Sequence, residues 1–326
     1  MNHYFTKYSI CAKNILKRGI NMNRYHHLNE FYRNKFGERV LKICVDGGFT
    51  CPNRDGNCGI GGCIFCGASG SGEHLNSQKN ISEQVKDYFQ SYKATRANKF
   101  IVYFQNFSNT YDSLENLKNK YDAALIDERI IGISIATRPD CINEEIAKLL
   151  NSYTSKYFVS VELGLQTTNE NTAKFINRGY RNQVFTKAVA LLRKYHIDVI
   201  THIMIGLPNE SKDDLKNTID FINQHDIQGI KIHSTYVIQG TKLAVMYQLG
   251  QYIPLTLEEY IDLACFALAN LNPNLIIHRI SGDAPKDLLI APEWNSHKKW
   301  IINGIEKKLK EANLWQGKFV ENAKKI

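Results

Sequence analysis

The sequence predicts an α/β protein whose parallel strands form a full or partial barrel covered by helices. Short, almost continuously apolar segments alternate with amphipathic segments from about residue 40 to 280. That alternation is typical of parallel strands with helices packed on them. The repeated strand–helix units carry no dinucleotide-binding glycine fingerprint in their first turn. A barrel is therefore favoured, and an open, doubly wound sheet is the alternative.

Seven segments have the length and composition of buried strands. In order they are RVLKICV (39–45), KFIVYFQ (99–105), RIIGISIA (129–136), YFVSVELG (157–164), DVITHIMIG (198–206), GIKIHSTYV (229–237) and LIIHRI (275–280). Helices are predicted to begin between them, near Ser82, Asp112, Asn143, Asn182, Ser211 and Thr256. Several starts combine an N-cap residue with acidic residues in the first turn, as in NEE from Asn143 and TLEE from Thr256. Because barrel enzymes place their chemistry at the carboxyl ends of the strands, the residues after each strand are the first functional candidates.

Composition indicates a folded protein of one large or two ordinary domains. The chain has 326 residues, is 43% hydrophobic and contains no low-complexity tract. It has no apolar run long enough to span a bilayer, and its start lacks the apolar core of a signal peptide. We therefore expect a cytoplasmic protein without a membrane association. In a reducing compartment its eight cysteines are expected to bind metal rather than to form disulfides.

The net charge of +9 is concentrated at the two ends of the chain. Residues 1–39 carry a net charge of +6 and residues 297–326 a net charge of +5. We divide the chain into a basic N-terminal extension (1–38), a central barrel (39–285) and a basic helical C-terminal extension (286–326). Basic ends fit a polyanionic partner such as RNA, but they equally fit solvated faces of terminal helices. Charge alone does not decide between the two.

The loop CPNRDGNCGIGGCIFCG, residues 51–67, holds four cysteines and five glycines directly after the first strand. A disulfide knot, a zinc site and an iron–sulfur cluster compete as explanations. Structural zinc sites use four ligands, often in two paired CxxC units, whereas this loop has one such unit, Cys63 to Cys66. Iron–sulfur clusters are held by thiolates in glycine-rich loops. The loop favours a cluster and leaves zinc open.

Eight motifs give the loop its context. In order they are CPNRDG (51–56), GGCIFC (61–66), TRPDC (137–141), ELGLQT (162–167), RGY (178–180), GLPNE (206–210), GIKIH (229–233) and HRISGD (278–283). Together they closely resemble the radical SAM proteins of the YhcC/YtqA group, which includes the MnmL type and is related to the Elp3 catalytic subunit. The resemblance covers about residues 24–312 and lapses before Arg24, where Met22 is an alternative start to Met1. It implies a partial (β/α)6-type TIM barrel of the radical SAM class with a helical C-terminal extension.

The resemblance implies a [4Fe–4S] cluster bound by Cys51, Cys63 and Cys66. Three thiolates leave one iron for the amino and carboxylate groups of S-adenosylmethionine (SAM), and a one-electron donor such as flavodoxin or ferredoxin would reduce the cluster. Relatives usually lack a cysteine at the position of Cys58, so we expect Cys58 to be incidental. Cys141 is either a substrate-facing thiol or a packing residue. Three further cysteines are expected to be small hydrophobes: Cys11, Cys44 and Cys265.

The SAM site is predicted from the residues that follow the strands. YFQNFSNTYDS (103–113) replaces the common GGE motif and resembles an NTY variant, with Gln105, Asn109 and Thr110 as polar candidates. Glu162 and Gln166 are expected to bind the ribose and the methionyl amine; alternatively, Glu162 forms an ion pair with Arg138 or Arg178. In GLPNE, Asn209 replaces the glycine of relatives in a turn that approaches adenine. The full predicted cofactor-binding set is Gln105, Asn109, Arg138, Asp140, Glu162, Gln166, Arg178, Gly206 and Pro208.

Three histidines in apolar strands, His202, His233 and His278, indicate a polar barrel interior beside Lys231 and Arg279. A single histidine of this kind is more often a core residue than a catalyst. The predicted catalytic residues are His233, Arg279 and Asp283, and the other two histidines are expected to be core.

For the MnmL type, the resemblance implies modification of the tRNA wobble uridine, converting a C5 carboxymethylaminomethyl group to aminomethyl, with a tRNA methyltransferase acting next. The basic C-terminal segment offers Trp300 and Trp315 for stacking on RNA; alternatively, residues 300–309 form a helix that buries Trp300, Ile301, Ile305 and Leu309 against the barrel. Two further alternatives are a radical SAM enzyme acting on a small molecule or protein, and a zinc-stabilised RNA-binding module without catalysis.

Overall fold

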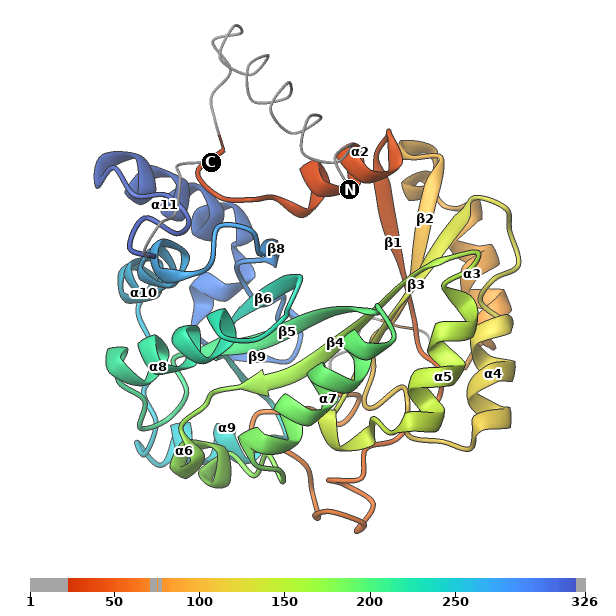
Figure 1. Cartoon of the computed structure of the whole chain (residues 1–326). Helices are drawn as coiled ribbons and strands as arrows, with labels where there is room; N and C mark the ends of the chain where they lie inside the picture. Colours follow the sequence, from red (N-terminus) through yellow and green to blue (C-terminus); the bar gives the residue numbers. More distant parts are fainter. Residues whose placement is uncertain (1–22, 71–74, 76–77, 321–326) are drawn as a thin grey trace, which may run out of the picture.

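Seven parallel strands form one curved sheet in a computed structural model of the chain, which describes residues 23–70, 75 and 78–320. The strands follow one another in sequence order across the sheet, with helices on its outer face (Figure 1). They are β1 (Val40–Val45), β2 (Lys99–Phe104), β3 (Ile130–Thr137), β4 (Phe158–Gln166), β5 (Asp198–Ile205), β6 (Gly229–Ser234) and β8 (Ile276–Arg279). Sequential order means that every crossover advances in the same direction. The partial barrel is therefore confirmed, and the doubly wound alternative is wrong.

The helices begin where local signals predicted them, each within two residues. The six predicted helices are α3 (Ile81–Gln90), α4 (Leu114–Asp122), α5 (Glu144–Tyr153), α7 (Asn182–Lys194), α8 (Lys212–Asn223) and α10 (Leu257–Asn270). Capping boxes formed by Asn80, Ser211 and Thr256 start three of them. Each such cap contributes about 1 kcal/mol by satisfying backbone N–H groups. Two short helices, α6 (Glu170–Phe175) and α9 (Lys242–Gln248), were not predicted.

The strands are apolar throughout because both faces of the sheet are covered. In β2, for example, five of six residues are buried. Several polar side chains within the strands are also buried, among them Ser134, Ser160, Glu162, Thr201 and Lys231. Burying such groups is costly unless they pair with one another. These residues therefore mark the polar interior of the half-barrel.

The predicted sixth strand is too long. It was expected to reach residue 237, but β6 ends at Ser234. The Thr235 N–H donates to the Ile205 carbonyl, and beyond it β5 offers no further partner because Gly206 turns away with φ +87°. The chain then forms β7 (Val237–Ile238), which pairs antiparallel with β9 (Leu289–Ala291) in a separate two-stranded sheet.

Segments from near both ends of the chain lie at the open side of the half-barrel. Helix α2 (Leu28–Phe36) packs beside β1 and β8, and His27 pairs with Ile277 in an isolated parallel bridge. The Gln316 N–H donates to the Arg24 carbonyl, and the Gln316 side chain accepts from the His26 N–H. The predicted division at residues 38 and 285 stays a prediction. Met1, Cys11 and Met22 lie outside the described residues.

Helix α11 (Lys298–Glu311) confirms most of its predicted buried stripe. Ile301, Ile305 and Leu309 are fully buried. Trp300 does not belong to the stripe: it is 56% exposed and stacks on the His297 ring at a centroid distance of 4.0 Å. A side chain one position before Ile301 lies about 100° around the helix, which turns it away from the core. No helix in the described part of the chain is long and apolar enough to span a bilayer.

Candidate active site

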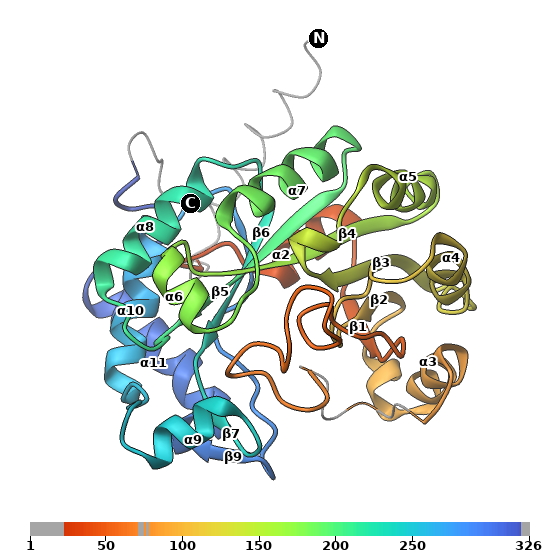
Figure 2. The same ribbon diagram turned by 90° about the horizontal axis from the view of Figure 1, so that it is seen from below.

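The cysteine loop lies across the carboxyl ends of the strands, in the middle of the view in Figure 2. The Arg54 guanidinium stabilises the loop by donating a hydrogen bond to the Cys66 carbonyl at 2.9 Å. The Gly62 N–H donates to the Asn53 carbonyl at 2.8 Å. Gly62 has φ +76°, and a Cβ on it would meet the Arg54 side chain at 2.9 Å. The positive φ therefore favours glycine here, and a Cβ would also displace the Arg54 side chain that holds the loop.

Cys51, Cys63 and Cys66 line one cavity, and Cys58 is exposed and outside its lining. The cavity has a volume of about 230 Å³, far more than a single water needs, so it can admit a small molecule. Burial and the neighbouring thiols raise the pKa of Cys63 to about 12. Such a thiol needs a bound cation to become a thiolate at neutral pH. The structure thus brings together the three predicted ligands and separates the fourth thiol from them.

The three thiols that line the cavity are the predicted ligands of the cluster. Within residues 23–70, 75 and 78–320, no three His, Cys, Asp or Glu side chains are grouped as ligands of one metal ion. Cluster ligands each bind a different iron, so three thiols around a shared cavity satisfy that requirement. Of the other cysteines, Cys141 is buried outside the cavity lining, Cys265 is buried and Cys44 is partly buried.

Half of the other predicted site residues line the same cavity: Gln105, Arg138, Glu162, Gln166, Arg178 and His233. The other half do not: Asn109, Asp140, Gly206, Pro208, Arg279 and Asp283. Asn109 is fully buried, and its side-chain amide donates to three backbone carbonyls, of Phe104, Asn106 and Ala136. It therefore holds the ends of β2 and β3 together.

Arg138 and Asp140 form a bidentate ion pair with N–O distances of 2.9 and 2.7 Å. The other guanidinium nitrogen of Arg138 donates to the Arg178 carbonyl at 2.9 Å. Asp140 thus orients Arg138 at the cavity wall. Arg279 pairs instead with Asp283 at 3.1 Å, and Asp283 also binds Lys298 at 2.9 Å.

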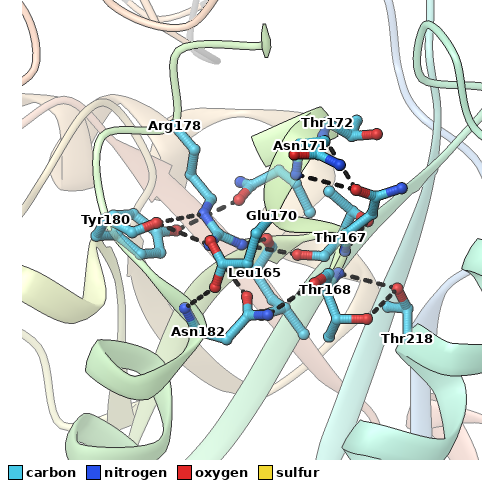
Figure 3. Close-up of polar contacts among 12 residues, drawn as sticks. Leu165, Thr167, Thr168, Glu170, Asn171, Thr172, Arg178, Tyr180, Asn182 and Thr218 are labelled. Carbon is cyan, nitrogen blue, oxygen red and sulfur yellow. Dashed lines mark hydrogen bonds and ion pairs between the residues drawn. The ribbon is translucent and has the colours of Figure 1, made fainter. Parts of the chain in front are cut away.

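Arg178 is almost completely buried, and most of its N–H groups donate hydrogen bonds to backbone carbonyls (Figure 3). Its guanidinium donates to the carbonyls of Leu165, Thr167 and Tyr180 and to the Asn182 side chain at 2.7–3.0 Å. The arginine therefore connects the segment at the end of β4 to the loop before α7. That segment contains Gln166, which has φ +61°. The Tyr180 hydroxyl donates to the Gly164 carbonyl and fixes the same turn.

Glu162 is the centre of a buried polar network. One carboxylate oxygen accepts from Lys42 at 2.7 Å and from Ser134 at 3.1 Å, and the other from Lys231 and from His202 at 2.8 Å. The ion pair of Glu162 with Arg138 or Arg178, suggested as an alternative by the sequence, is therefore wrong. Arg138 binds Asp140, and the nearest carboxylate to Arg178 is Glu170 at 3.6 Å.

The network changes the ionisation of its members. Burial would raise the pKa of Glu162, but Lys231 and Lys42 hold it well below the ordinary value. Burial lowers the pKa of Lys231 to about 7 and that of His202 to about 4. Burial also lowers the pKa of His233 well below its ordinary value. At neutral pH the two histidines are therefore neutral, and Lys231 is poised between its two forms.

Three residues of the site were missed by sequence reasoning as site residues: Lys42, Tyr103 and His202, which lines the cavity although it was expected to be a core residue. Lys42 donates to Glu162, and Tyr103 lines the cavity and accepts from Lys231 at 3.1 Å. Their signal is a polar residue within an apolar strand, facing the inside of the barrel. The alternation of side chains along β1 and β2 could have revealed it.

The comparisons with known proteins agree with this geometry. Residues 51–222 match the Radical SAM superfamily, and residues 227–311 match the Radical_SAM C-terminal domain. The chain is 39% identical to the Bacillus subtilis protein YtqA, over 91% of this chain and 93% of YtqA. It is 33% identical to Escherichia coli YhcC, over 80% and 84% of the two chains. Human Elongator complex protein 3 is 28% identical over 64% of this chain and 36% of its own length.

A solved structure also matches. Elp3 from Methanocaldococcus infernus superposes with a TM-score of 0.65 at 19% identity, covering 85% of this chain and 64% of that one. The chain therefore belongs to the radical SAM superfamily. Within it, the chain groups with YtqA and YhcC and is related to Elp3. Proteins of this superfamily normally bind a [4Fe–4S] cluster and SAM, and the three-thiol cavity fits those cofactors.

Glu210, at the end of GLPNE, gives a pH-dependent prediction. It accepts a hydrogen bond from Thr167, and burial raises its pKa to about 7 from 4.5. The unfolded chain therefore releases this proton at lower pH than the folded chain, so stability falls as the pH rises toward and through 7. We expect Glu210→Gln to gain about 2 kcal/mol relative to wild type between pH 5 and 8.

Urea unfolding of the purified proteins at pH 5 and pH 8 measures this gain. Glu145→Gln, at an exposed position of α5, controls for the amide substitution itself. Equal pH dependence in wild type and Glu210→Gln would show that Glu210 is solvated rather than buried.

Proposed function

We propose that this chain is an enzyme that binds a [4Fe–4S] cluster through Cys51, Cys63 and Cys66 and SAM beside it. The observation that carries the proposal is that these three thiols line the same cavity as polar side chains at the strand ends. When bound, the two cofactors supply a 5′-deoxyadenosyl radical by one-electron cleavage of SAM. The protein itself binds the two cofactors, orients them and excludes water from the cavity.

Each of those tasks has residues suited to it. Arg178 and the Arg138–Asp140 pair make the cavity wall rigid by binding backbone and each other. Gln105 and Gln166 offer amide groups to the polar parts of SAM. Apolar side chains complete the lining and exclude water: Phe65, Phe107, Met204 and Ile238.

For the substrate we propose tRNA, at the C5 side chain of the wobble uridine. The reaction would convert carboxymethylaminomethyl to aminomethyl: the adenosyl radical would take a hydrogen atom from the CH2 carbon of the carboxymethyl group, a one-electron acceptor would oxidise the carbon radical to an imine, and water would release the two-carbon fragment as glyoxylate. A tRNA methyltransferase would use the resulting primary amine. Support comes from the resemblance to the MnmL type and from the relationship to Elp3. The exposed Trp300 at the start of the basic helix α11 is available for stacking. Three lysines of that helix are already in ion pairs, namely Lys298, Lys307 and Lys308.

The remaining parts of the proposal concern partners and organisation. A cytoplasmic one-electron donor such as flavodoxin or ferredoxin would reduce the cluster. Residues 39–285 would form the catalytic barrel, and residues 1–38 and 286–326 would extend it toward the RNA.

Mass spectrometry of tRNA nucleosides from cells with and without the gene tests the substrate. We expect 5-carboxymethylaminomethyluridine to accumulate without the protein, and 5-aminomethyluridine and its methylated derivative to disappear. Purified protein, reconstituted anaerobically and given SAM and a reductant, should reverse the change on tRNA from the deletion strain. An unchanged wobble uridine would contradict the tRNA assignment and favour a small-molecule or protein substrate. A colourless, zinc-containing protein would favour the RNA-binding module without catalysis.

A further inference from the structure

The floor of the cavity is polar, and two lysines outside the cavity lining, Lys42 and Lys231, contact it through Glu162. Tyr103, Glu162, His202 and His233 face the cavity from β2, β4, β5 and β6. Lys231 lies directly behind them and is 5% exposed. Its ammonium contacts both Glu162 and the Tyr103 hydroxyl. These lining side chains share the cavity with Cys51, Cys63 and Cys66 but are not among the predicted cluster ligands.

Glu162 cannot serve as a ligand for SAM or substrate without breaking existing contacts. Its two oxygens already accept from four donors, which exhausts the lone pairs of a carboxylate. Two of those donors are ammonium groups, on Lys42 and Lys231. When Lys231 is protonated, one buried carboxylate faces two buried cations, and this imbalance is relieved either by loss of the Lys231 proton or by the arrival of another anion.

The cations retain unused donors. The Lys231 ammonium has three N–H groups, and contacts within the described part of the chain use two of them. Lys42 likewise uses two, toward Ser134 and Glu162. The Nε2 atom of His233 is buried and has no hydrogen-bond partner among the described residues. A buried ring nitrogen without a partner beside a cavity indicates a ligand that supplies one.

No other group around Lys231 supplies the missing negative charge. Burial raises the pKa of Tyr103 and Cys44, which keeps both neutral, and lowers the pKa of the three histidines, which keeps them neutral too. Asp283 is held by Arg279 and Lys298. The titratable and charged groups that face Lys231 are Lys42 and Cys44 on β1, Tyr103 on β2, Glu162 on β4, His202 on β5, His233 on β6, and His278 and Arg279 on β8.

We propose that this floor, formed by Lys231, His233, Tyr103 and the Lys42–Glu162 pair, binds one carboxylate of the substrate. Lys231 donates a charge-assisted hydrogen bond to it, and His233 offers a second from Nε2. Glu162 holds the two lysines in place and is a positioning residue. The identity of the carboxylate rests on the proposed function, in which the substrate side chain ends in a carboxymethyl group.

The same charge arrangement disfavours the product. Both side chains carry a protonated amine at neutral pH, but the aminomethyl group has lost the carboxylate that offsets this charge, so the product alone meets Lys42 and Lys231 with a net positive charge. Substrate is therefore attracted to the floor and product is repelled from it. This gives the site selectivity for the uncleaved side chain and promotes release of the amine.

Equilibrium dialysis of the anaerobic holoprotein against two nucleosides tests the proposal. We expect 5-carboxymethylaminomethyluridine to bind about 10- to 100-fold more tightly than 5-aminomethyluridine, as one charge-assisted contact implies. Lys231→Met should reduce the preference to within about twofold. Lys148→Met, at an exposed position of α5, should retain it. The preference should also weaken as the pH rises above about 7, because deprotonated Lys231 has no charge to offer.

A second variant keeps the test valid if Lys231→Met fails to fold. Lys231→Met leaves the Glu162 carboxylate with one cation fewer. The double variant Glu162→Gln/Lys231→Met removes both charges, and its binding preference is measured in the same way. Loss of preference in a folded double variant supports the proposal, and full preference in either folded variant overturns it. No preference in the wild type also overturns it. If the deletion alters the tRNA nucleosides but the protein shows no carboxylate preference, only this inference is contradicted. If the preference is present but the tRNA nucleosides are unchanged, only the tRNA substrate is contradicted.

Discussion

Cys63→Ala is expected to abolish cluster binding and SAM cleavage, while Cys58→Ala leaves both intact. Cys63 is one of three thiols around the cavity, and a cluster that keeps one iron open for SAM has no replacement ligand. The expected loss exceeds the roughly 10- to 100-fold typical of residues that only support a metal ligand. Iron and sulfide content, visible absorbance and 5′-deoxyadenosine formation after anaerobic reconstitution measure the effect.

Cys58→Ala is the matched control because it removes a thiol from the same loop. Cys58 is exposed and outside the cavity lining, so its loss removes no contact with the cavity. If Cys58→Ala loses the cluster and Cys63→Ala keeps it, the three-ligand assignment is wrong.

Replacement of Glu162 by leucine is expected to destabilise the fold by about 3–5 kcal/mol, the cost of leaving buried charges without their partner. Lys42 and Lys231 would both lose the carboxylate that now contacts them. Glu162→Gln, which keeps the shape and some hydrogen bonds, should cost less. Urea unfolding of the purified proteins near pH 7 gives these differences.

The double variant Glu162→Leu/Lys231→Met separates charge from packing. The double variant also removes Lys231, one of the two cations that lose their partner in Glu162→Leu. Its free energy of unfolding should therefore be higher than the sum of the two single changes predicts. Simple additivity would mean that Glu162 and Lys231 are not energetically coupled, contrary to their contact in the structure.

Features that depend on neighbours in sequence were predictable, and features that depend on strand register were not. Asn80, Ser211 and Thr256 start helices through contacts three residues away, which sequence alone reveals. The contact of Lys42 with Glu162 spans 120 residues and four strands. The residues around Lys42 in the sequence give no sign that Glu162 is its partner. The sequence therefore predicted two arginines as alternative partners for Glu162, and both predictions are wrong.

The motifs located functional residues but did not predict the role of each one. Asn109 and Arg178 were predicted to bind cofactor because they follow strands and belong to motifs. In the structure their donors are spent on backbone carbonyls that hold the loops around the cavity. A motif marks a residue that the site requires. It does not reveal whether the residue touches the ligand or fixes the loop that does, because both roles select the same polar side chains at strand ends.

The bridge between His27 and Ile277 has a consequence for association between molecules. A half-barrel leaves the last strand, β8, with a row of backbone groups that could pair with a strand of another copy. Here the Ile277 N–H already donates to the His26 carbonyl at 2.8 Å, and Gln316 holds the segment that provides it. The two chain ends thus act together as a guard against aggregation by strand addition along that edge.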